Sequence, residues 1–147
     1  MIEIRYIKNQ QELEEMFYQR WFVLRKPLGM ERGSEKDEYD DSDSAVHLVA
    51  VFQDKIIGSA RLRQLSPELG SISYVAVSPE FQNQGIGTKL MHKLIEIAQE
   101  KNLHAVKLRA RINALNFYKR LGFTEEGELH DYRGIPHIFM YCKLANS

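Results

Sequence analysis

The sequence predicts an α/β fold in which about four helices pack on a mixed, twisted sheet of about seven strands. Two observations carry this prediction. Strand-like alternation and helix-like spacing of apolar residues both recur along the chain, and the helical segments fall between strand segments. With 147 residues, of which 44% are hydrophobic and 27% charged, the chain is long enough to bury a core without disulfides or metals. We therefore expect a single domain spanning residues 1–147.

The beginning of the chain predicts a strand, a helix and a loop. Residues 2–7 largely alternate apolar and polar side chains, and Asn9 can cap a helix over residues 10–26, which Pro27 stops. The segment 31–44 holds seven acidic and two basic residues and almost no apolar ones. We predict that this segment is an exposed loop.

Three strands are expected in the middle of the chain. Residues 46–52 and 56–65 are rich in β-branched and apolar side chains and flank a turn at 53–55, which is typical of a hairpin. Gly58 is a candidate bulge position within the second of these strands. A third strand is predicted at residues 71–77.

The second half predicts a long helix followed by shorter elements. After the stretch 81–90, apolar side chains recur on one helical face, and Asn102 sits where that helix can end. The remaining elements are a strand at 104–110, a short helix at 113–121, and strands at about 123–129 and 136–144.

The composition argues against several classes of protein. Twenty basic and twenty acidic residues give a formal net charge of zero, so bulk charge favours neither nucleic acid nor an anionic membrane as a partner. Cys142 is the only cysteine, which excludes an intrachain disulfide and fits a cytoplasmic location. No apolar stretch resembles a signal peptide or approaches the roughly 20 residues of a membrane span. The five histidines show no metal-ligand spacing, so we expect no metal.

The stretch FQNQGIGTKL, residues 81–90, places two glycines one residue apart at the start of the long helix. The simplest interpretation is a turn with a tight helix start. A dinucleotide-binding fingerprint would need a third glycine where Leu90 stands, and a P-loop needs four residues between its first glycine and a Gly-Lys pair. A fourth interpretation is an anion site, where backbone without side chains and the helix N-terminus face a pyrophosphate.

The same stretch resembles the Q/R-x-x-G-x-G/A signature of the GNAT superfamily of N-acetyltransferases, matched by Gln82, Gly85 and Gly87. YVAVSPEFQNQGIGTKLMHKL is similar to the family's acetyl-CoA segment, and FYKRLGF, residues 117–123, is similar to its second hallmark. The resemblance implies an acyl-CoA N-acyltransferase fold with acetyl-CoA as cosubstrate. It also implies a primary amine acceptor, on a small molecule or a peptide. The cofactor-binding residues that it implies are Val75, Val77, Gln82, Asn83, Gln84, Gly85, Ile86, Gly87 and Thr88.

The resemblance also implies two catalytic roles. The Val77 NH would polarise the thioester carbonyl, and Tyr118 would protonate the departing thiolate. The alternative for Tyr118 is a core tyrosine, because it follows the helical spacing of its apolar neighbours. No serine lies in a G-x-S-x-G elbow, so direct transfer in a ternary complex is favoured over a covalent acyl-enzyme.

No general base is assigned by the resemblance. Many members carry a glutamate on the strand before the glycines, where this chain has SISY at 71–74, and an asparagine where it has Arg111. His130, Asp131 and His137 are candidates, since a histidine titrates in the useful pH range. A chain of water molecules is the alternative.

Two further groups of side chains have alternative interpretations. Lys89 and Lys93 share a helix face and either meet the phosphates of CoA or stay solvated. Arg20, Trp21 and Arg25 either line the acceptor cleft or belong to the core. The rival to an enzyme is a non-catalytic acyl-CoA-binding module that acts as a sensor or partner domain. A homodimer is compatible with the sequence, which does not determine the oligomeric state.

Overall fold

The computed structural model describes residues 1–145, which contain one seven-stranded sheet in the order β1-β2-β3-β4-β5-β7-β6. Neighbouring strands are antiparallel except β4 and β5, which run parallel. The mixed sheet confirms the predicted α/β fold. Its strands are β1 (Glu3–Tyr6), β2 (Ala45–Phe52), β3 (Lys55–Gln64), β4 (Leu69–Val77), β5 (Ala105–Arg111), β6 (Thr124–Tyr132) and β7 (Ile135–Lys143).

Residues 1–145 contain three α-helices, so the prediction of about four packed helices is wrong. These are α1 (Gln10–Leu24), α2 (Ile86–Glu100) and α3 (Leu115–Arg120). Three short 3-10 helices fill connections instead, at Lys26–Leu28, Pro79–Phe81 and Ile112–Ala114. The first two of these 3-10 helices each have a proline in their first turn. A proline is tolerated there, but in the interior of a helix it removes a hydrogen bond and clashes with the preceding turn. Such single turns cannot cover a sheet.

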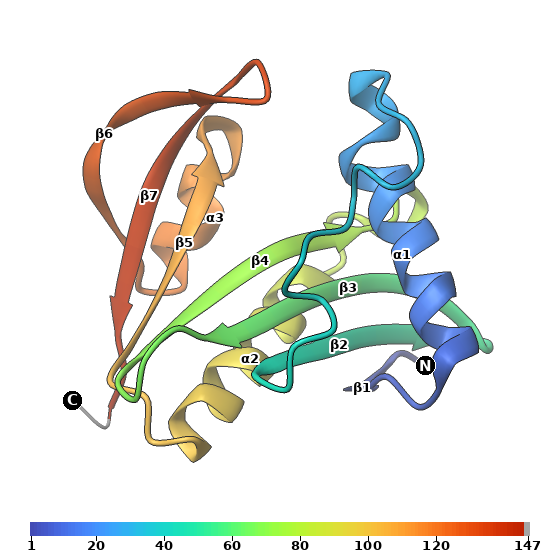
Figure 1. Ribbon diagram of the computed structural model, residues 1–147, viewed down its shortest axis with the longest axis horizontal. Coiled ribbons are helices and arrows are strands. Elements are labelled where there is room, and N and C mark those ends of the chain that lie inside the picture. Colours follow the sequence, from blue (N-terminus) through green and yellow to red (C-terminus); the bar gives the residue numbers. More distant parts are fainter. Residues whose placement is uncertain (146–147) are drawn as a thin grey trace.

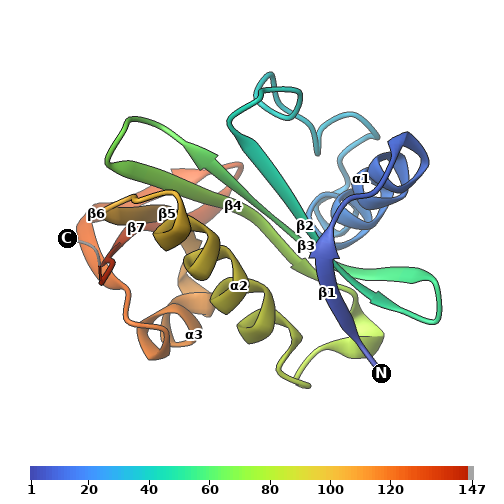
Figure 2. The same cartoon turned by 90° about the horizontal axis from the view of Figure 1, so that it is seen from below.

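Helix α1 lies on one face of the strands β2 to β4 (Figures 1 and 2). As predicted, the Asn9 side chain caps it by accepting a hydrogen bond of 2.9 Å from the Glu12 NH. The helix ends at Leu24, before the predicted end, and the chain continues into the 3-10 turn Lys26–Leu28, where Pro27 has no NH to extend the α-helical hydrogen bonds. Its buried face packs Met16 and Phe17 against side chains of β2 and β3, namely Val49, Val51 and Ile56.

Helix α2 covers the opposite face of the sheet (Figure 2) and forms the larger part of the core. Leu90, Met91 and Leu94 are completely buried on its inner face. Burying each such side chain stabilises the fold by about 1.5–3 kcal/mol. The helix stops near Asn102, which adopts a left-handed φ of 63°, as its predicted role at the helix end requires.

The hairpin of β2 and β3 follows the prediction closely. Its turn uses Gln53 and Asp54 with left-handed φ angles of 49° and 64°, the geometry that suits a two-residue hairpin. The register shifts between the pairs Ala50 with Gly58 and Val51 with Ile56, so one extra residue of β3 lies between them. This bulge confirms the irregularity expected beside Gly58.

Candidate functional site

The parallel ladder between β4 and β5 is short, and a cleft opens where it ends. Leu69–Ser71 pair with Ala105–Lys107, and beyond these residues the two strands diverge (Figure 1). The cleft between them has a volume of about 420 Å³. Its lining comes from the end of α1, the loop 31–44, β3, β4, β5, the start of α3 and the β6–β7 hairpin.

A bulge in β4 contributes to this divergence. Ser59 pairs with Ala76 and Arg61 with Ser73, so two residues of β4 oppose one residue of β3 between those pairs. One of the two, Tyr74, adopts a left-handed φ of 57°, which is uncommon for a bulky residue. Because a bulge bends its strand and increases the local twist, it directs the end of β4 away from β5.

The end of β4 turns backbone groups toward the opening. The Ser78 NH donates to the Ile57 carbonyl of β3 over 2.9 Å. Successive residues of a strand point their backbone groups to alternate edges, so the NH and carbonyl of Val77 point away from β3. The Gln82 amide donates to that Val77 carbonyl over 3.0 Å. The Val77 NH therefore points away from β3, and its predicted role stays a prediction. Val75 lines the cleft, whereas Val77 does not.

The glycine stretch forms a tight loop that ends in α2. Asn83 and Gly85 adopt left-handed φ angles of 63° and 79°, and α2 begins at Ile86, within the stretch. Gly85 is the N-cap residue and offers no side-chain cap, so the first NH groups of α2 are available to an anion. The Ile86 side chain is 2% exposed and belongs to the core. Only its backbone can therefore serve the predicted cofactor site.

The two glycines are required for different physical reasons. A Cβ on Gly85 would meet nothing within 4 Å, but its φ of 79° is one that side chains rarely adopt. A Cβ on Gly87 would lie 3.2 Å from the Phe117 ring. The sequence-based expectation that both positions stay bare for a pyrophosphate is therefore incomplete, since Gly87 also allows α2 to approach the residue beside Tyr118.

Tyr118 lies both in the core and at the wall of the cleft, so its catalytic role stays a prediction. Its ring packs in the core, with edge-to-face contacts to Phe117 and Phe123 at centroid distances of 5.0 and 5.9 Å. The same residue lines the cleft. Burial raises the pKa of Tyr118 to about 12, although the nearby positive charge of Arg111 opposes this shift. The hydroxyl is therefore protonated at neutral pH and can act as a proton donor.

Among the three candidate bases, only His137 lines the cleft. Its Nδ1 lies 2.8 Å from the Ile135 carbonyl, so Nδ1 carries the hydrogen and Nε2 is left as the proton acceptor. Burial lowers the pKa of His137 below its ordinary value. His130 instead stacks on Phe139 at 4.7 Å, and the Asp131 carboxylate accepts a hydrogen bond from the Gly134 NH in the hairpin turn.

Arg20, Trp21 and Arg25 lie at different depths. Arg25 lines the cleft, whereas Arg20 is completely buried beneath it. The indole of Trp21 donates to the Met30 carbonyl over 2.9 Å and does not line the cleft. The acceptor-cleft interpretation thus has support for Arg25 alone of these three residues.

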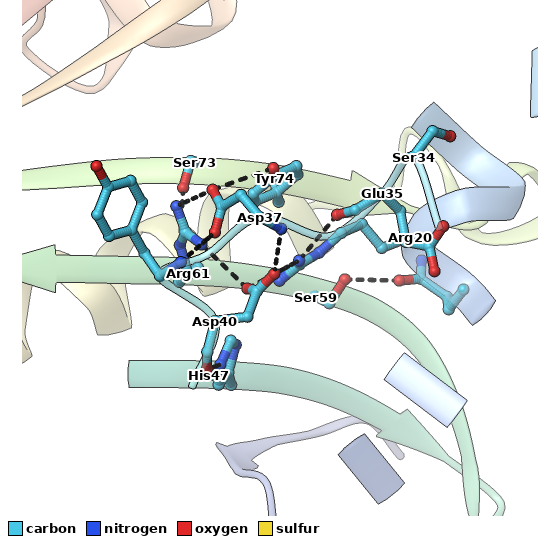
Figure 3. Close-up of polar contacts among 12 residues, drawn as sticks. Arg20, Ser34, Glu35, Asp37, Asp40, His47, Ser59, Arg61, Ser73 and Tyr74 are labelled. Carbon is cyan, nitrogen blue, oxygen red and sulfur yellow. Dashed lines mark hydrogen bonds and ion pairs between the residues drawn. The ribbon is translucent and has the colours of Figure 1, made fainter. Parts of the chain in front are cut away.

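The loop 31–44 is not simply exposed, which corrects the sequence-based prediction. Glu35 is 0% exposed and Asp40 is 6% exposed. Figure 3 shows the reason for Asp40, which lies between two guanidinium groups and accepts hydrogen bonds from both Arg20 and Arg61. Burying an acid is costly unless it is paired, and the partners here come from α1 and β3, far away in the sequence.

Asp37 extends this buried network toward the cleft. It forms two hydrogen bonds with the Arg61 guanidinium, at 2.6 and 3.0 Å, and accepts a third from the Tyr74 hydroxyl at 3.2 Å (Figure 3). Burial alone would raise the pKa of Asp37, but the hydrogen bond and charge of Arg61 outweigh it and lower the pKa. The network holds the loop against β3 and supports the strained Tyr74.

The lysines on α2 remain outside the cleft. Lys93 pairs with Glu96 over 2.9 Å on the exposed face of the helix. Lys89 is exposed in the first turn, close to the loop that holds the glycines. These positions favour the solvated interpretation for Lys93 and keep a phosphate contact by Lys89 as a prediction.

Several cleft residues were missed by the interpretation of the sequence. These are basic side chains of β3, β5 and the β6–β7 turn: Arg61, Arg63, Lys107, Arg109 and Arg133. A signal was present, because the stretches RLR at 61–63 and KLRAR at 107–111 place a basic residue at every second position. Such alternation puts the charges on one face of a strand. What the sequence did not provide was the pairing that brings both strands to one cleft.

Two further findings concern residues 1–145 only. They contain no group of three or more histidine, cysteine, aspartate or glutamate side chains that could hold a metal ion. None of their helices is long and apolar enough to cross a membrane.

Comparison with known proteins gives consistent results. The model of the acetyltransferase (GNAT) family matches residues 10–123. The uncharacterised N-acetyltransferase YjcF of Bacillus subtilis (strain 168) is 29% identical over 135 residues, which cover 90% of this chain and 94% of that protein. An acyl-CoA N-acyltransferase from Pseudomonas aeruginosa has a similar structure, with a TM-score of 0.85, 24% identity and coverage of 97% and 98%. A GNAT family acetyltransferase from Elizabethkingia anophelis, solved with acetyl-CoA bound, gives a TM-score of 0.72, 20% identity and coverage of 97% and 98%.

Proposed function

Because the chain belongs to the acetyltransferase (GNAT) family and is an acyltransferase, we propose that it transfers an acetyl group from acetyl-CoA directly to a primary amine held in the cleft between β4 and β5. One observation carries this proposal. Val75, Tyr118 and His137, which come from separate elements, line the same cleft. A residue predicted to contact acetyl-CoA, the predicted acid and a candidate base therefore border one cleft, and this supports the proposal.

Acetyl-CoA enters this proposal as a substrate, with its pyrophosphate at the glycine loop. The NH groups at the start of α2 and the left-handed turn at Gly85 supply donors for the phosphate oxygens. The Gln82 and Gln84 side chains hold the loop by hydrogen bonds to the Val77 and Glu80 carbonyls, at 3.0 and 3.4 Å. The pantetheine arm would then follow the unpaired edge of β4.

In the proposed step, the amine nitrogen attacks the acetyl carbon and the carbon–sulfur bond breaks. The Val77 NH stabilises the negative charge that develops on the carbonyl oxygen. The nitrogen loses one proton to His137 Nε2, and the sulfur gains one proton from the Tyr118 hydroxyl. The products are an N-acetyl amide and CoA. Solvent then takes the extra proton from His137 and returns a proton to the Tyr118 oxygen.

His137 is the preferred base because its neutral form is favoured in the folded protein. Burial lowers its pKa, and the positive charges of Arg111 and Arg109 act in the same direction, while the hydrogen bond to Ile135 opposes them. The residue as a whole is 6% exposed. A neutral imidazole at the cleft wall can accept a proton at physiological pH.

The experiment that tests the proposal combines binding with turnover. Calorimetry should detect acetyl-CoA binding, and a thiol reagent should detect CoA release when primary amines are added. A chain that binds acetyl-CoA but releases no thiol with any amine would instead be the non-catalytic acyl-CoA module. Absence of binding at millimolar acetyl-CoA would refute both alternatives. The same preparation can be passed through a sizing column to test for the homodimer.

A further inference from the structure

The cleft is strongly basic although the chain as a whole has no net charge. Seven basic side chains line it against a single carboxylate, that of Asp37. They converge from four parts of the fold, which are the end of α1, β3, β5 and the turn between β6 and β7. The basic residues are Arg25, Arg61, Arg63, Lys107, Arg109, Arg111 and Arg133.

Protein carboxylates neutralise only one of these seven charges. Arg61 forms ion pairs with Asp37 and Asp40, at 2.6 and 3.0 Å. For the other six side chains, no carboxylate of residues 1–145 lies within ion-pair distance. The cleft therefore carries an excess of positive charge that the described part of the chain does not balance.

Aromatic rings and backbone carbonyls hold several of these cations in place. The Arg109 guanidinium lies 3.9 Å from the centre of the Tyr132 ring and 5.0 Å from that of Phe139. Arg111 donates to the Leu24 carbonyl over 3.2 Å, and Arg25 donates to the Ser34 carbonyl over 3.1 Å. Stacking orients a guanidinium while leaving its planar edge of donors available to a carboxylate or phosphate.

Holding these like charges together has an electrostatic cost. Burial lowers the pKa of Arg25, and the charges of Arg133 and Arg111 lower it further. The pKa of Tyr132 also reflects the surrounding positive charge. Burial would raise this pKa, but a hydrogen bond with Arg133 and the charges of Arg133, Arg109 and Arg25 lower it. A bound anion would offset this repulsion, as a complementary charge does in an ion pair.

The basic cleft is distinct from the loop that would bind the pyrophosphate. None of residues 82–88, all of which the structure describes, lines it. The basic residues sit instead beside Tyr118 and His137, where the acceptor amine would react. A volume of about 420 Å³ lies within the range of small-molecule sites and is too small for a folded partner.

We propose that the acceptor is a small primary amine that also carries an anionic group, either a carboxylate or a phosphate, which the arginines of the cleft bind. This inference rests on the proposed acetyl transfer, because it assigns the substrate class of the same site. The amine nitrogen points to His137, and the anionic group pairs with Arg109 and its neighbours. Specificity then arises from charge, since a neutral alkylamine leaves these cations unpaired.

Matched acceptors test the proposal. γ-Aminobutyrate differs from propylamine by its carboxylate, and phosphoethanolamine differs from ethanolamine by its phosphate. We expect kcat/KM for at least one anionic member to exceed that of its neutral partner by about 10- to 100-fold, the value of one charged hydrogen-bonded pair. The pair with the larger ratio identifies the anion as carboxylate or phosphate. Equal values within both pairs would overturn the proposal while leaving acetyl transfer intact.

A variant links the effect to the cleft. Arg109→Gln should reduce the preference for the anionic acceptor about tenfold or more, whereas Arg120→Gln, on the exposed side of α3, is the matched control and should retain it. An unchanged preference in Arg109→Gln and in the second variant Arg133→Gln would also overturn the proposal. Added salt should weaken the preference of the wild-type chain.

A binding measurement separates this inference from the proposed function. Calorimetry in the presence of CoA measures the affinity for γ-aminobutyrate and phosphoethanolamine without turnover. If thiol release fails for every amine but an anionic amine binds and Arg109→Gln weakens it, the anion site stands and the acetyl transfer fails. If neither anionic amine binds more tightly than its neutral partner, the anion site is refuted, whatever the turnover.

Discussion

Asp40 Oδ1 lies 3.0 Å from Arg61 Nη1, and both side chains are almost completely buried. The same carboxylate oxygen lies 3.0 Å from Arg20 Nη1. One acid of the loop 31–44 therefore joins α1 to β3. Because Arg61 also binds Asp37 at the edge of the cleft, this buried pair connects the stability of the loop with the shape of the cleft.

Asp40→Asn should strongly destabilise the protein. The substitution removes one negative charge and leaves Arg20 and Arg61 as buried cations with one carboxylate fewer, which costs about 3–5 kcal/mol in such networks. Asp41→Asn, at the exposed neighbouring position, is the matched control and should change the free energy of unfolding by less than about 0.5 kcal/mol. Urea denaturation of both variants measures the difference, and equal midpoints would contradict the structural role of Asp40.

Tyr118→Phe should lower turnover while keeping the fold. The ring packing against Phe117 and Phe123 is retained, and only the hydroxyl is lost. Loss of a general acid typically costs about 10²- to 10⁴-fold in rate, and the lower end is expected because a thiolate leaves readily. The turnover rate, the melting temperature and the affinity for acetyl-CoA should be measured together. Wild-type turnover would assign Tyr118 to the core alone.

His137→Gln should remove the acidic limb of the pH–rate profile. The pKa of His137 lies below 6.5 in the folded protein, so the base form persists at pH values where a free histidine is already charged. Turnover of the wild type should therefore decline only below pH 6.5, and turnover of the variant should be low throughout, by about 10²- to 10⁴-fold. An acidic limb that survives in the variant would assign it to another group.

The same shift has a consequence for stability. Between the folded pKa of His137 and 6.5, the unfolded chain binds more protons than the folded one, so stability falls as the pH falls through this window. The glutamine variant should lose less stability than the wild type over that interval. Thermal melts across the interval provide a readout that does not depend on catalysis.

Gly85→Ala and Gly87→Ala should fail in different ways. At Gly85 the methyl group has space but the left-handed φ of 79° is strained, which costs about 1–2 kcal/mol and displaces the loop from its phosphate-binding conformation. At Gly87 the methyl group meets the Phe117 ring at 3.2 Å. We therefore expect weaker acetyl-CoA binding for Gly85→Ala. For Gly87→Ala we expect an additional loss of turnover through the displaced α3.

A double variant checks the second part of this prediction. Replacing Phe117 by leucine in the Gly87→Ala background shortens the side chain that the new methyl group meets, so part of the turnover should return. Calorimetry with acetyl-CoA reports on the loop, and thiol release reports on Tyr118. Identical losses in the two alanine variants, with no rescue, would mean that both glycines serve the loop alone. The bulkier Gly85→Val and Gly87→Val are expected to weaken binding further.

Much of the fold was predictable because local signals agreed with the tertiary structure. The Asn9 cap, the two-residue turn at Gln53 and Asp54, and the end of α2 near Asn102 each depend on a few neighbouring residues. The expected number of about four helices was wrong, because the apolar spacing indicated helices at three segments only and the structure adds just short 3-10 turns such as Pro79–Phe81.

The candidate site was less predictable because its chemistry depends on pairing between distant segments. Glu35 and Asp40 looked like members of a solvated acidic run. The approach of Arg20 and Arg61 explains the burial of Asp40, whereas the Glu35 carboxylate accepts a hydrogen bond from the Gly33 NH. The role of Gly87 depends on Phe117, which lies on another helix. Motifs pointed to the glycine loop and Tyr118. The charge of the cleft could be recognised only from the sheet, which brings basic residues of distant strands together.

The short β4–β5 ladder has a consequence for the evolution of specificity. Within residues 1–145, the pairing of Leu69–Ser71 with Ala105–Lys107 is the only strand pairing that joins the two halves of the sheet. One half lies next to the glycine loop, and the other contributes Arg109, Arg133 and His137. Substitutions in β5, β6 and β7 can therefore accumulate without altering the hydrogen bonds of β2, β3 and β4. On the proposed function, we expect a chimera that carries β6 and β7 from a relative to take on much of that relative's choice of amine.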